Sequence, residues 1–187
     1  MKNIKKLKKL QKLVKKWSDD RCITSNGKSV IQLTKLISEK SEISEGLLKN
    51  DIDLIEDAIG DTLVVMINLA VLLSKEGNCS ELDLRMCNVD KQYDLSSEKA
   101  LFDLDVRFGE IADGIGKGKK CEIISELNYC LRILNKISNS FNLKIEDCLE
   151  VAYNEIKDRK GVLTKEGNFV KSTDPYYEQA LKDLENS

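Results

Sequence analysis

The segment 32–72, QLTKLISEKSEISEGLLKNDIDLIEDAIGDTLVVMINLAVL, contains two helical runs separated by a short break, and the rest of the chain is organised around it. Glu39 and Glu42 lie three residues apart on the first run, and Asp57 and Asp61 lie four apart on the second. Each acidic pair therefore projects from one side of its own helix. The sequence predicts an antiparallel helical hairpin whose two acidic pairs face each other across the seam.

Four carboxylates that converge inside a helical bundle would repel one another strongly. A hard divalent cation with oxygen ligands relieves that repulsion, and Mg²⁺ is the usual ion in phosphate chemistry. The pattern therefore predicts a magnesium site formed by Glu39, Glu42, Asp57 and Asp61. The alternative is that these acidic pairs are the solvated faces of ordinary helices.

The composition favours an all-α protein with one large domain or two small ones. The chain has 187 residues, of which 41% are hydrophobic and 5% aromatic, with a single proline. Its net charge of −2 gives no global electrostatic argument for nucleic acid or for a membrane surface. The most apolar run, 62–74, is too short to span a bilayer, and the N-terminus lacks the apolar region of a signal peptide. We expect a cytoplasmic protein.

Histidine is absent from the chain, so imidazole is excluded as a general base and as a metal ligand. Any chemistry must use carboxylates, Lys, Tyr, Ser or Cys. The six cysteines show no CxxC spacing, and several fall at apolar helical positions. We expect free, buried thiols rather than a disulfide framework.

The apolar periodicity and the capping signals predict a series of helices along the chain. The predicted helices cover 2–17, 29–49, 52–75, 97–113, 121–141, 144–158 and 175–185; turns cover 24–27 and 114–120, and a connector covers 76–95. The first helix is amphipathic and rich in lysine. It is either a surface for nucleic acid or anionic lipid, or the solvated face of a packed helix, and we favour the packed helix.

Two segments of the hairpin resemble the MazG-like all-α nucleotide pyrophosphohydrolases, which carry an ExxE segment on one helix and an ExxD segment on the next. Glu39-Lys40-Ser41-Glu42 matches the first segment. In the second, Ala58 stands where the family has glutamate, and only Asp61 matches. Asp57 can share the face of Asp61. The string DAIGDTLVV, residues 57–65, resembles the compact, phage-type branch of the family.

A second resemblance lies towards the C-terminus. The string AYNEIKDRKG, residues 152–161, is similar to the end of phage MazG-like proteins. That resemblance implies an asparagine and basic side chains that contact substrate phosphate, which by position are Asn154, Lys157 and Arg159. The alternative is an ordinary helix C-terminus, where basic residues complement the helix dipole.

The second half of the chain also resembles the first, at an offset of 68 residues. EISEGLLK, residues 42–49, aligns with EIADGIGK, residues 110–117. Under this offset Arg107 replaces Glu39, Glu126 replaces Ala58 and Tyr129 replaces Asp61. We therefore expect a second half without metal, in a tandem repeat that forms a pseudo-dimer. This arrangement resembles the all-α dimeric dUTPases, in which one unit holds metal and phosphates and its partner helps enclose the base.

The expected organisation has four parts. They are a first MazG-like repeat with the basic helix at 1–76, a connector at 77–96, a degenerate second repeat at 97–172 and a short C-terminal helix at 173–187. The resemblance implies Mg²⁺-dependent cleavage of a (deoxy)nucleoside triphosphate to monophosphate and pyrophosphate. It implies Glu39, Glu42 and Asp61 as catalytic residues.

Several alternatives stay open at this point. One is a catalytically degenerate nucleotide-binding protein, and another is a helical interaction module with a basic N-terminal helix. Either Asp57 or Glu126 supplies the acid that is missing at Ala58. The expected partner is the nucleoside triphosphate, with no membrane and no nucleic acid. The sequence leaves open whether the chain forms a homodimer, and which base and sugar the substrate carries.

Overall fold

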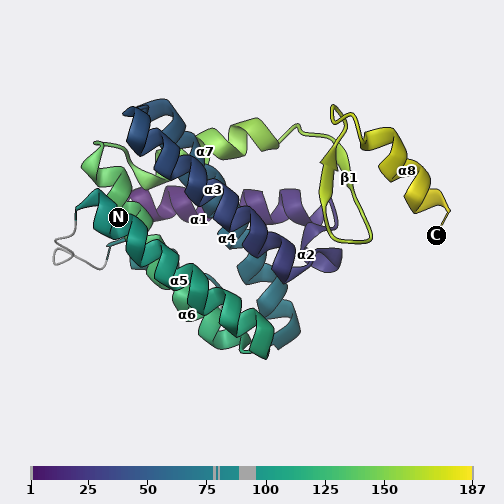
Figure 1. Cartoon of the computed structure of the whole chain (residues 1–187), viewed down its shortest axis with the longest axis horizontal. Coiled ribbons are helices and arrows are strands. Elements are labelled where there is room, and N and C mark those ends of the chain that lie inside the picture. Colours follow the sequence, from purple (N-terminus) through teal and green to yellow (C-terminus); the bar gives the residue numbers. More distant parts are fainter. Residues whose placement is uncertain (1, 78, 80, 89–95, 187) are drawn as a thin grey trace.

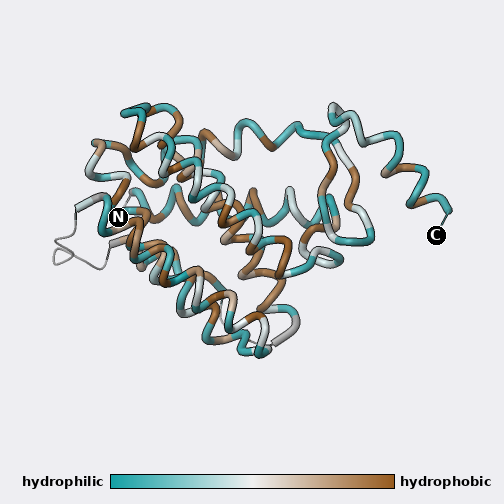
Figure 2. The backbone as a smooth tube through the Cα atoms, viewed as in Figure 1, coloured by the Kyte–Doolittle hydropathy of each residue, from teal (hydrophilic) through white to brown (hydrophobic). Residues whose placement is uncertain are grey.

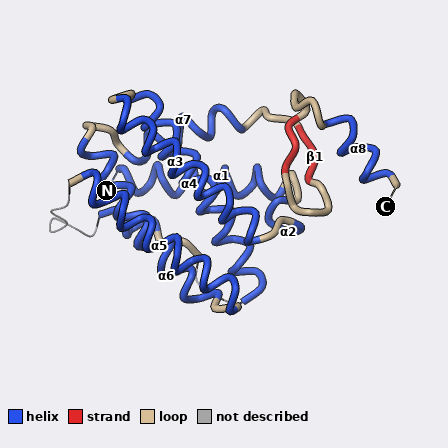
Figure 3. Tube along the Cα trace, in the orientation of Figure 1, coloured by secondary structure: helices blue, strands red, loops and turns tan. Residues whose placement is uncertain are grey.

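The protein is mostly helical in a computed structural model, which describes residues 2–77, 79, 81–88 and 96–186 (Figure 1). The helices are α1 (Lys2–Asp19), α2 (Ile23–Asn26), α3 (Ser29–Lys49), α4 (Ile52–Gly77), the 3-10 helix η1 (Leu84–Asn88), α5 (Ser97–Lys117), α6 (Lys120–Ser140), α7 (Ile145–Ile156) and α8 (Tyr177–Glu185). Two short strands, β1 (Gly161–Leu163) and β2 (Phe169–Lys171), form an antiparallel hairpin (Figure 3). The predicted all-α class is confirmed.

Three local predictions were wrong. The turn expected at 24–27 is mostly the short helix α2, and the strands β1 and β2 were not foreseen. The turn expected at 114–120 is much shorter, because α5 continues to Lys117 and α6 begins at Lys120. Gly118 alone takes a positive φ of 67° between them, so one glycine suffices to reverse the chain. Part of the predicted connector, 89–95, lies outside the described residues.

The two central hairpins turn in the same way. Asn50 ends α3 in the left-handed conformation, and the carbonyls of Gly46 and Leu47 accept hydrogen bonds from the backbone N–H groups of this turn. Gly118 ends α5 in the same conformation, and there the acceptors are the carbonyls of Gly114 and Ile115. A Cβ on Gly46 would lie 2.7 Å from Cγ1 of Ile55, and one on Gly114 would lie 2.6 Å from Cγ1 of Ile123. Gly114 and Ile123 follow Gly46 and Ile55 by the same offset of 68 residues, so the two turns that match in sequence also match in geometry.

Helix α4 lies at the centre of the bundle. It packs against α1, α2, α3, α6 and α7, and its apolar side chains belong to the hydrophobic core. Figure 2 shows the hydrophobic residues, in brown, along the helices of the bundle. Among the described residues, α4 is the one helix long and apolar enough, by length and composition alone, to cross a membrane, over Ile52–Lys75, a longer stretch than the apolar run 62–74. Its apolar window is 83% buried within the fold, as in the core helix of a bundle.

Gly60 lies where α4 and α7 approach closely. A Cβ at this position would stand 2.3 Å from the carbonyl oxygen of Cys148 and 2.9 Å from Cβ of Ala152. Glycine weakens a helix interior by up to about 1 kcal/mol relative to alanine. A larger residue at this position would clash with α7, which explains why glycine occurs here despite its cost to helix stability.

The β-hairpin closes one end of the bundle. Phe169 on β2 meets the ring of Trp17 edge-on, with the centroids 5.8 Å apart. Helix α8 packs on the hairpin and projects away from the helical body (Figure 1). The hairpin therefore lies against the C-terminal end of α1 and, through Gly167 beside Lys28, next to the start of α3.

The expectation of free thiols was wrong for two of the six cysteines. Cys79 and Cys121 form a disulfide, with their Cα atoms 5.3 Å apart, which ties the segment after α4 to the first turn of α6. Cys87, Cys130 and Cys148 are free and buried, as predicted, whereas Cys22 is free and exposed. The pairing depends on how the helices pack, which cysteine spacing alone does not reveal.

Candidate functional site

The four acids of the hairpin act on one another electrostatically. The pKa of Glu39 is raised to about 7, first by burial and then by the charge of Asp61. Glu42 and Asp57 raise it further. Because α3 and α4 are antiparallel neighbours, the predicted pairs face the same seam.

Asp61 lies in a similar environment. Its pKa is raised to about 6, first by burial and then by the charge of Asp57, while the guanidinium of Arg159 opposes the shift. Asp57 has a buried Oδ1 atom without a hydrogen-bond partner in the described part of the chain. Buried carboxylate oxygens are normally paired, so this seam offers oxygen ligands that the protein itself does not satisfy.

Within the described residues, no three acidic, cysteine or histidine side chains are grouped closely enough to hold a metal ion by themselves. A closed protein cage is not required, because Mg²⁺ usually keeps several waters and binds one or two carboxylates together with substrate phosphates. The donor set consists of carboxylate oxygens alone, and Asp57 has one oxygen to spare. The chemistry of the acids therefore fits Mg²⁺.

Glu39 and Asp61 line a small cavity of about 90 Å³ together with three cations. Those cations are Lys35 on α3, Arg159 after α7 and Lys171 on β2. The pKa of Lys35 is lowered, chiefly by burial, whereas the nearby Glu39 opposes that shift. Carboxylates that attract a cation and basic groups that attract an anion thus share one cavity.

Of the predicted phosphate-binding residues, Arg159 alone lines this cavity. Asn154 and Lys157 are exposed, and Nζ of Lys157 donates a hydrogen bond to Oδ1 of Asn154 at 3.1 Å. Sequence reasoning missed Lys35 and Lys171. Lys35 precedes Glu39 by one helical turn, a spacing that could have placed it on the same face, whereas Lys171 depends on the unforeseen hairpin.

The second half has an ion pair where the first has its acids. Arg107, the counterpart of Glu39, donates to Glu126 at 2.8 Å and to Asp103 at 3.3 Å. Its guanidinium also lies 5.3 Å from the ring centroid of Tyr129, the counterpart of Asp61. Because the acids of this cluster are paired with Arg107, they do not require a cation to neutralise them.

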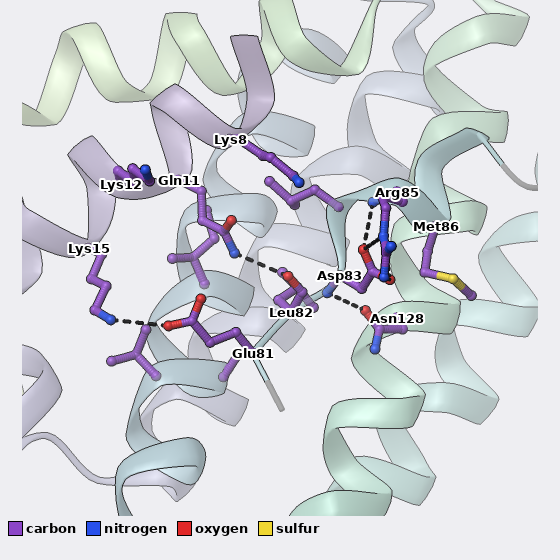
Figure 4. Close-up of a pocket in the computed structure, with 14 residues that line it drawn as sticks. Lys8, Gln11, Lys12, Lys15, Glu81, Leu82, Asp83, Arg85, Met86 and Asn128 are labelled. Carbon is purple, nitrogen blue, oxygen red and sulfur yellow. Dashed lines mark hydrogen bonds and ion pairs between the residues drawn. The ribbon is translucent and has the colours of Figure 1, made fainter. Parts of the chain in front are cut away.

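A larger cavity of about 810 Å³ lies elsewhere, between α1 and residues 81–86 (Figure 4). Its polar groups are largely bonded within the protein: Lys15 pairs with Glu81 at 3.2 Å, and the backbone N–H of Asp83 donates to Oδ1 of Asn128 at 2.8 Å. None of the four seam acids lines it. We therefore assign the functional site to the smaller cavity.

Comparison with known proteins shows a similarity to a phage protein. The chain is 29% identical over 164 residues to an uncharacterized 18.2 kDa protein in the rep–hol intergenic region of Haemophilus phage HP1 (strain HP1c1). The alignment covers 78% of this chain and 97% of that protein. No family model matches the chain. No solved structure matches it significantly.

Proposed function

We propose that this protein is a Mg²⁺-dependent nucleotide pyrophosphohydrolase with a MazG-like helical fold. It cleaves a (deoxy)nucleoside triphosphate to the monophosphate and pyrophosphate. The observation that carries the proposal is the cavity in which Glu39 and Asp61 meet Lys35, Arg159 and Lys171. A polyphosphate with its divalent cation needs both kinds of group in one place.

Each set of residues has its own role in this reaction. One or two of the carboxylates of Glu39, Glu42, Asp57 and Asp61 would hold Mg²⁺ together with the substrate phosphates. When bound, the ion would neutralise phosphate charge and lower the pKa of the attacking water. If Glu39 does not bind the ion, its carboxylate accepts the proton of that water as a general base. The water forms a new bond to the α- or the β-phosphorus, the bond from that phosphorus to the bridging oxygen breaks, and the products are the monophosphate and pyrophosphate.

The proposal includes an origin by duplication. The equal turns at Gly46 and Gly114, each packed on an isoleucine nine residues later, support a tandem repeat at the offset of 68. In that case the hairpin α5–α6 is a pseudo-subunit that has lost its acids. The ion pair of Arg107 with Glu126 replaces the metal-binding function there and stabilises the bundle.

A second candidate is a protein that binds a nucleotide without hydrolysing it. Two observations favour it: Ala58 is fully buried where the family has an acid, and the described acids form no closed metal cage. The basic helix α1 gives less support to an interaction module, because Lys6 is already bound by Asp147 and Glu150. Its apolar side also lies in the core.

A nucleotide screen tests the proposed function. Each common ribo- and deoxyribonucleoside triphosphate is incubated with the protein and Mg²⁺, and released pyrophosphate is measured. We expect turnover that is lost in Glu39→Gln and retained in Glu110→Gln, because Glu110 is an exposed glutamate on α5 that does not line the cavity. Tight nucleotide binding with no pyrophosphate from any substrate would favour the second candidate.

A further inference from the structure

The cavity along the α3–α4 seam has a charged end and an uncharged end. On α3, Gln32 precedes Glu39 by seven residues, and on α4 Asn68 follows Asp61 by seven. Seven residues of helix span roughly 10 Å. Because the two helices are antiparallel, Gln32 and Asn68 lie together at the end away from the acids, and both line the cavity.

The uncharged end is largely apolar, with walls that include Val65, Leu163 and Phe169. Two residues that line the cavity each have a buried polar atom without a hydrogen-bond partner among the described residues: Nε1 of Trp17, a donor, and Oε1 of Gln32, an acceptor. The side chains are only 7% and 2% exposed. Leaving such an atom unsatisfied costs about 1–3 kcal/mol, so each calls for a partner that a ligand would supply.

The neighbouring amide of Asn68 is held by the protein. Oγ of Ser18 donates a hydrogen bond to Oδ1 of Asn68 at 2.5 Å, and both side chains are buried. The guanidinium of Arg21 covers the Trp17 ring 4.7 Å from its centroid, which fixes the indole in place. The unpartnered donor and acceptor are thus presented by side chains with restricted freedom, as in a preorganised binding site.

We infer that this uncharged end binds the base of a pyrimidine nucleotide. Trp17 Nε1 donates to a ring carbonyl, and Gln32 Oε1 accepts from a ring N–H or an exocyclic amino group. The inference rests on the proposed function, which places the phosphates at the acids, roughly 10 Å away along α3. It adds two specificity-determining residues, Trp17 and Gln32, which contact the base and not the reacting phosphates.

The small cavity favours the smaller base. Its volume of about 90 Å³, which includes the part at the acids, is well below the roughly 300 Å³ at the lower end of ligand pockets, so binding of any base requires the lining to move apart. A two-ring purine requires more outward movement of the β-hairpin that carries Phe169 than a single pyrimidine ring does. A pyrimidine also offers an acceptor and a donor along one edge.

Binding of the four deoxynucleoside monophosphates with Mg²⁺, measured by calorimetry, tests the inference without relying on hydrolysis. We expect the pyrimidine nucleotides to bind at least tenfold more tightly than the purine nucleotides. Gln32→Met keeps the size of the side chain but removes its acceptor, and should weaken pyrimidine binding at least tenfold. The matched control is Gln11→Met, because Gln11 on α1 bonds the carbonyl of Leu82, outside this cavity, and should leave pyrimidine binding unchanged.

The possible results separate the two proposals. Equal binding of all four bases, or pyrimidine affinity unchanged in a folded Gln32→Met, overturns the base site and leaves the proposed function standing. Absence of binding for every nucleotide overturns both. If Gln32→Met does not fold, by circular dichroism, Trp17→Phe removes the N–H donor while keeping a ring. Undiminished pyrimidine affinity in that variant also contradicts the inference.

Discussion

The guanidinium of Arg21 donates two hydrogen bonds to the main-chain carbonyl oxygen of Arg159, from Nε at 2.9 Å and from Nη2 at 2.6 Å. Its Nη1 also donates to the carbonyl of Trp17 at 3.2 Å. One side chain thereby fastens the end of α1 to the segment after α7. That segment carries Arg159 into the cavity beside Asp61.

Removal of this link should weaken substrate binding more than turnover. In Arg21→Ala, Arg159 is no longer held beside the acids, and we expect KM for the preferred triphosphate to rise about tenfold, the effect of roughly 1.4 kcal/mol. Steady-state kinetics measure it. Arg85→Ala is the control, because Arg85 pairs with Asp83 at the surface. A KM equal to that of the wild type would show that Arg159 is held without Arg21.

Two of the helix-interior glycines, Gly60 and Gly109, should respond in opposite ways to alanine. At Gly60 the added methyl meets Cys148 and Ala152, so Gly60→Ala should reduce the free energy of unfolding by about 1–3 kcal/mol. At Gly109 nothing lies within 4 Å, and Gly109→Ala should raise it by about 0.5–1 kcal/mol. Urea denaturation measures both. A stabilising Gly60→Ala would disprove the close approach of α4 and α7.

Stability without metal should decrease as the pH rises towards neutrality. The folded-state pKa values of Glu39 and Asp61, about 7 and about 6, exceed the usual 4.5 and 3.8. Between about pH 4 and 7 the unfolded chain therefore loses these protons while the folded protein retains them, and folding becomes less favourable. Above pH 7 both carboxyl groups are ionised in the folded protein too, and they cause no further decrease in stability.

Urea midpoints measured in EDTA from pH 5 to 8 test this pH dependence. That range lies above the titration of Asp19 and Asp83, whose lowered pKa values give the opposite slope at more acidic pH. Glu39→Gln should flatten the slope, and Mg²⁺ should restore stability at pH 8. An unchanged slope in Glu39→Gln would mean that this carboxyl has an ordinary pKa.

Substitutions that remove one carboxylate should distinguish Asp57 from Glu126 as the replacement for the acid missing at Ala58. Asp57 has an oxygen without a partner among the described residues, whereas Glu126 is bound by Arg107. Asp57→Asn should therefore lower Mg²⁺ affinity and turnover at least tenfold, approaching Asp61→Asn. Glu126→Gln should stay within a few-fold of the wild type. Turnover at increasing Mg²⁺ concentration measures these effects, and equal damage from Glu126→Gln would mean that both halves share one site.

The sequence predicted the elements with strong helical periodicity and the acids placed on them. Glu39 and Asp61 could be anticipated because i, i+3 and i, i+4 spacing fixes which side of a helix a residue occupies. Lys171 could not, because it reaches the cavity from a three-residue strand that has little periodic signal. The same holds for the pairing of Cys79 with Cys121, which depends on how distant helices pack.

The helix ends were predicted less well than the helices, for a local reason. Gly114 and Gly116 suggested a turn, yet both lie within α5, and only Gly118 needs the positive φ. Gly114 is there because Ile123 packs against it. A glycine required by packing and a glycine required by a turn look alike in a single sequence.

The most direct test of the account is the identity of the products. The protein is incubated with its preferred nucleoside triphosphate and Mg²⁺, and the products are resolved by ³¹P nuclear magnetic resonance. The account predicts monophosphate and pyrophosphate in a one-to-one ratio, with no turnover in EDTA or in Glu39→Gln. Intact triphosphate for every nucleotide, or diphosphate with orthophosphate, would contradict it.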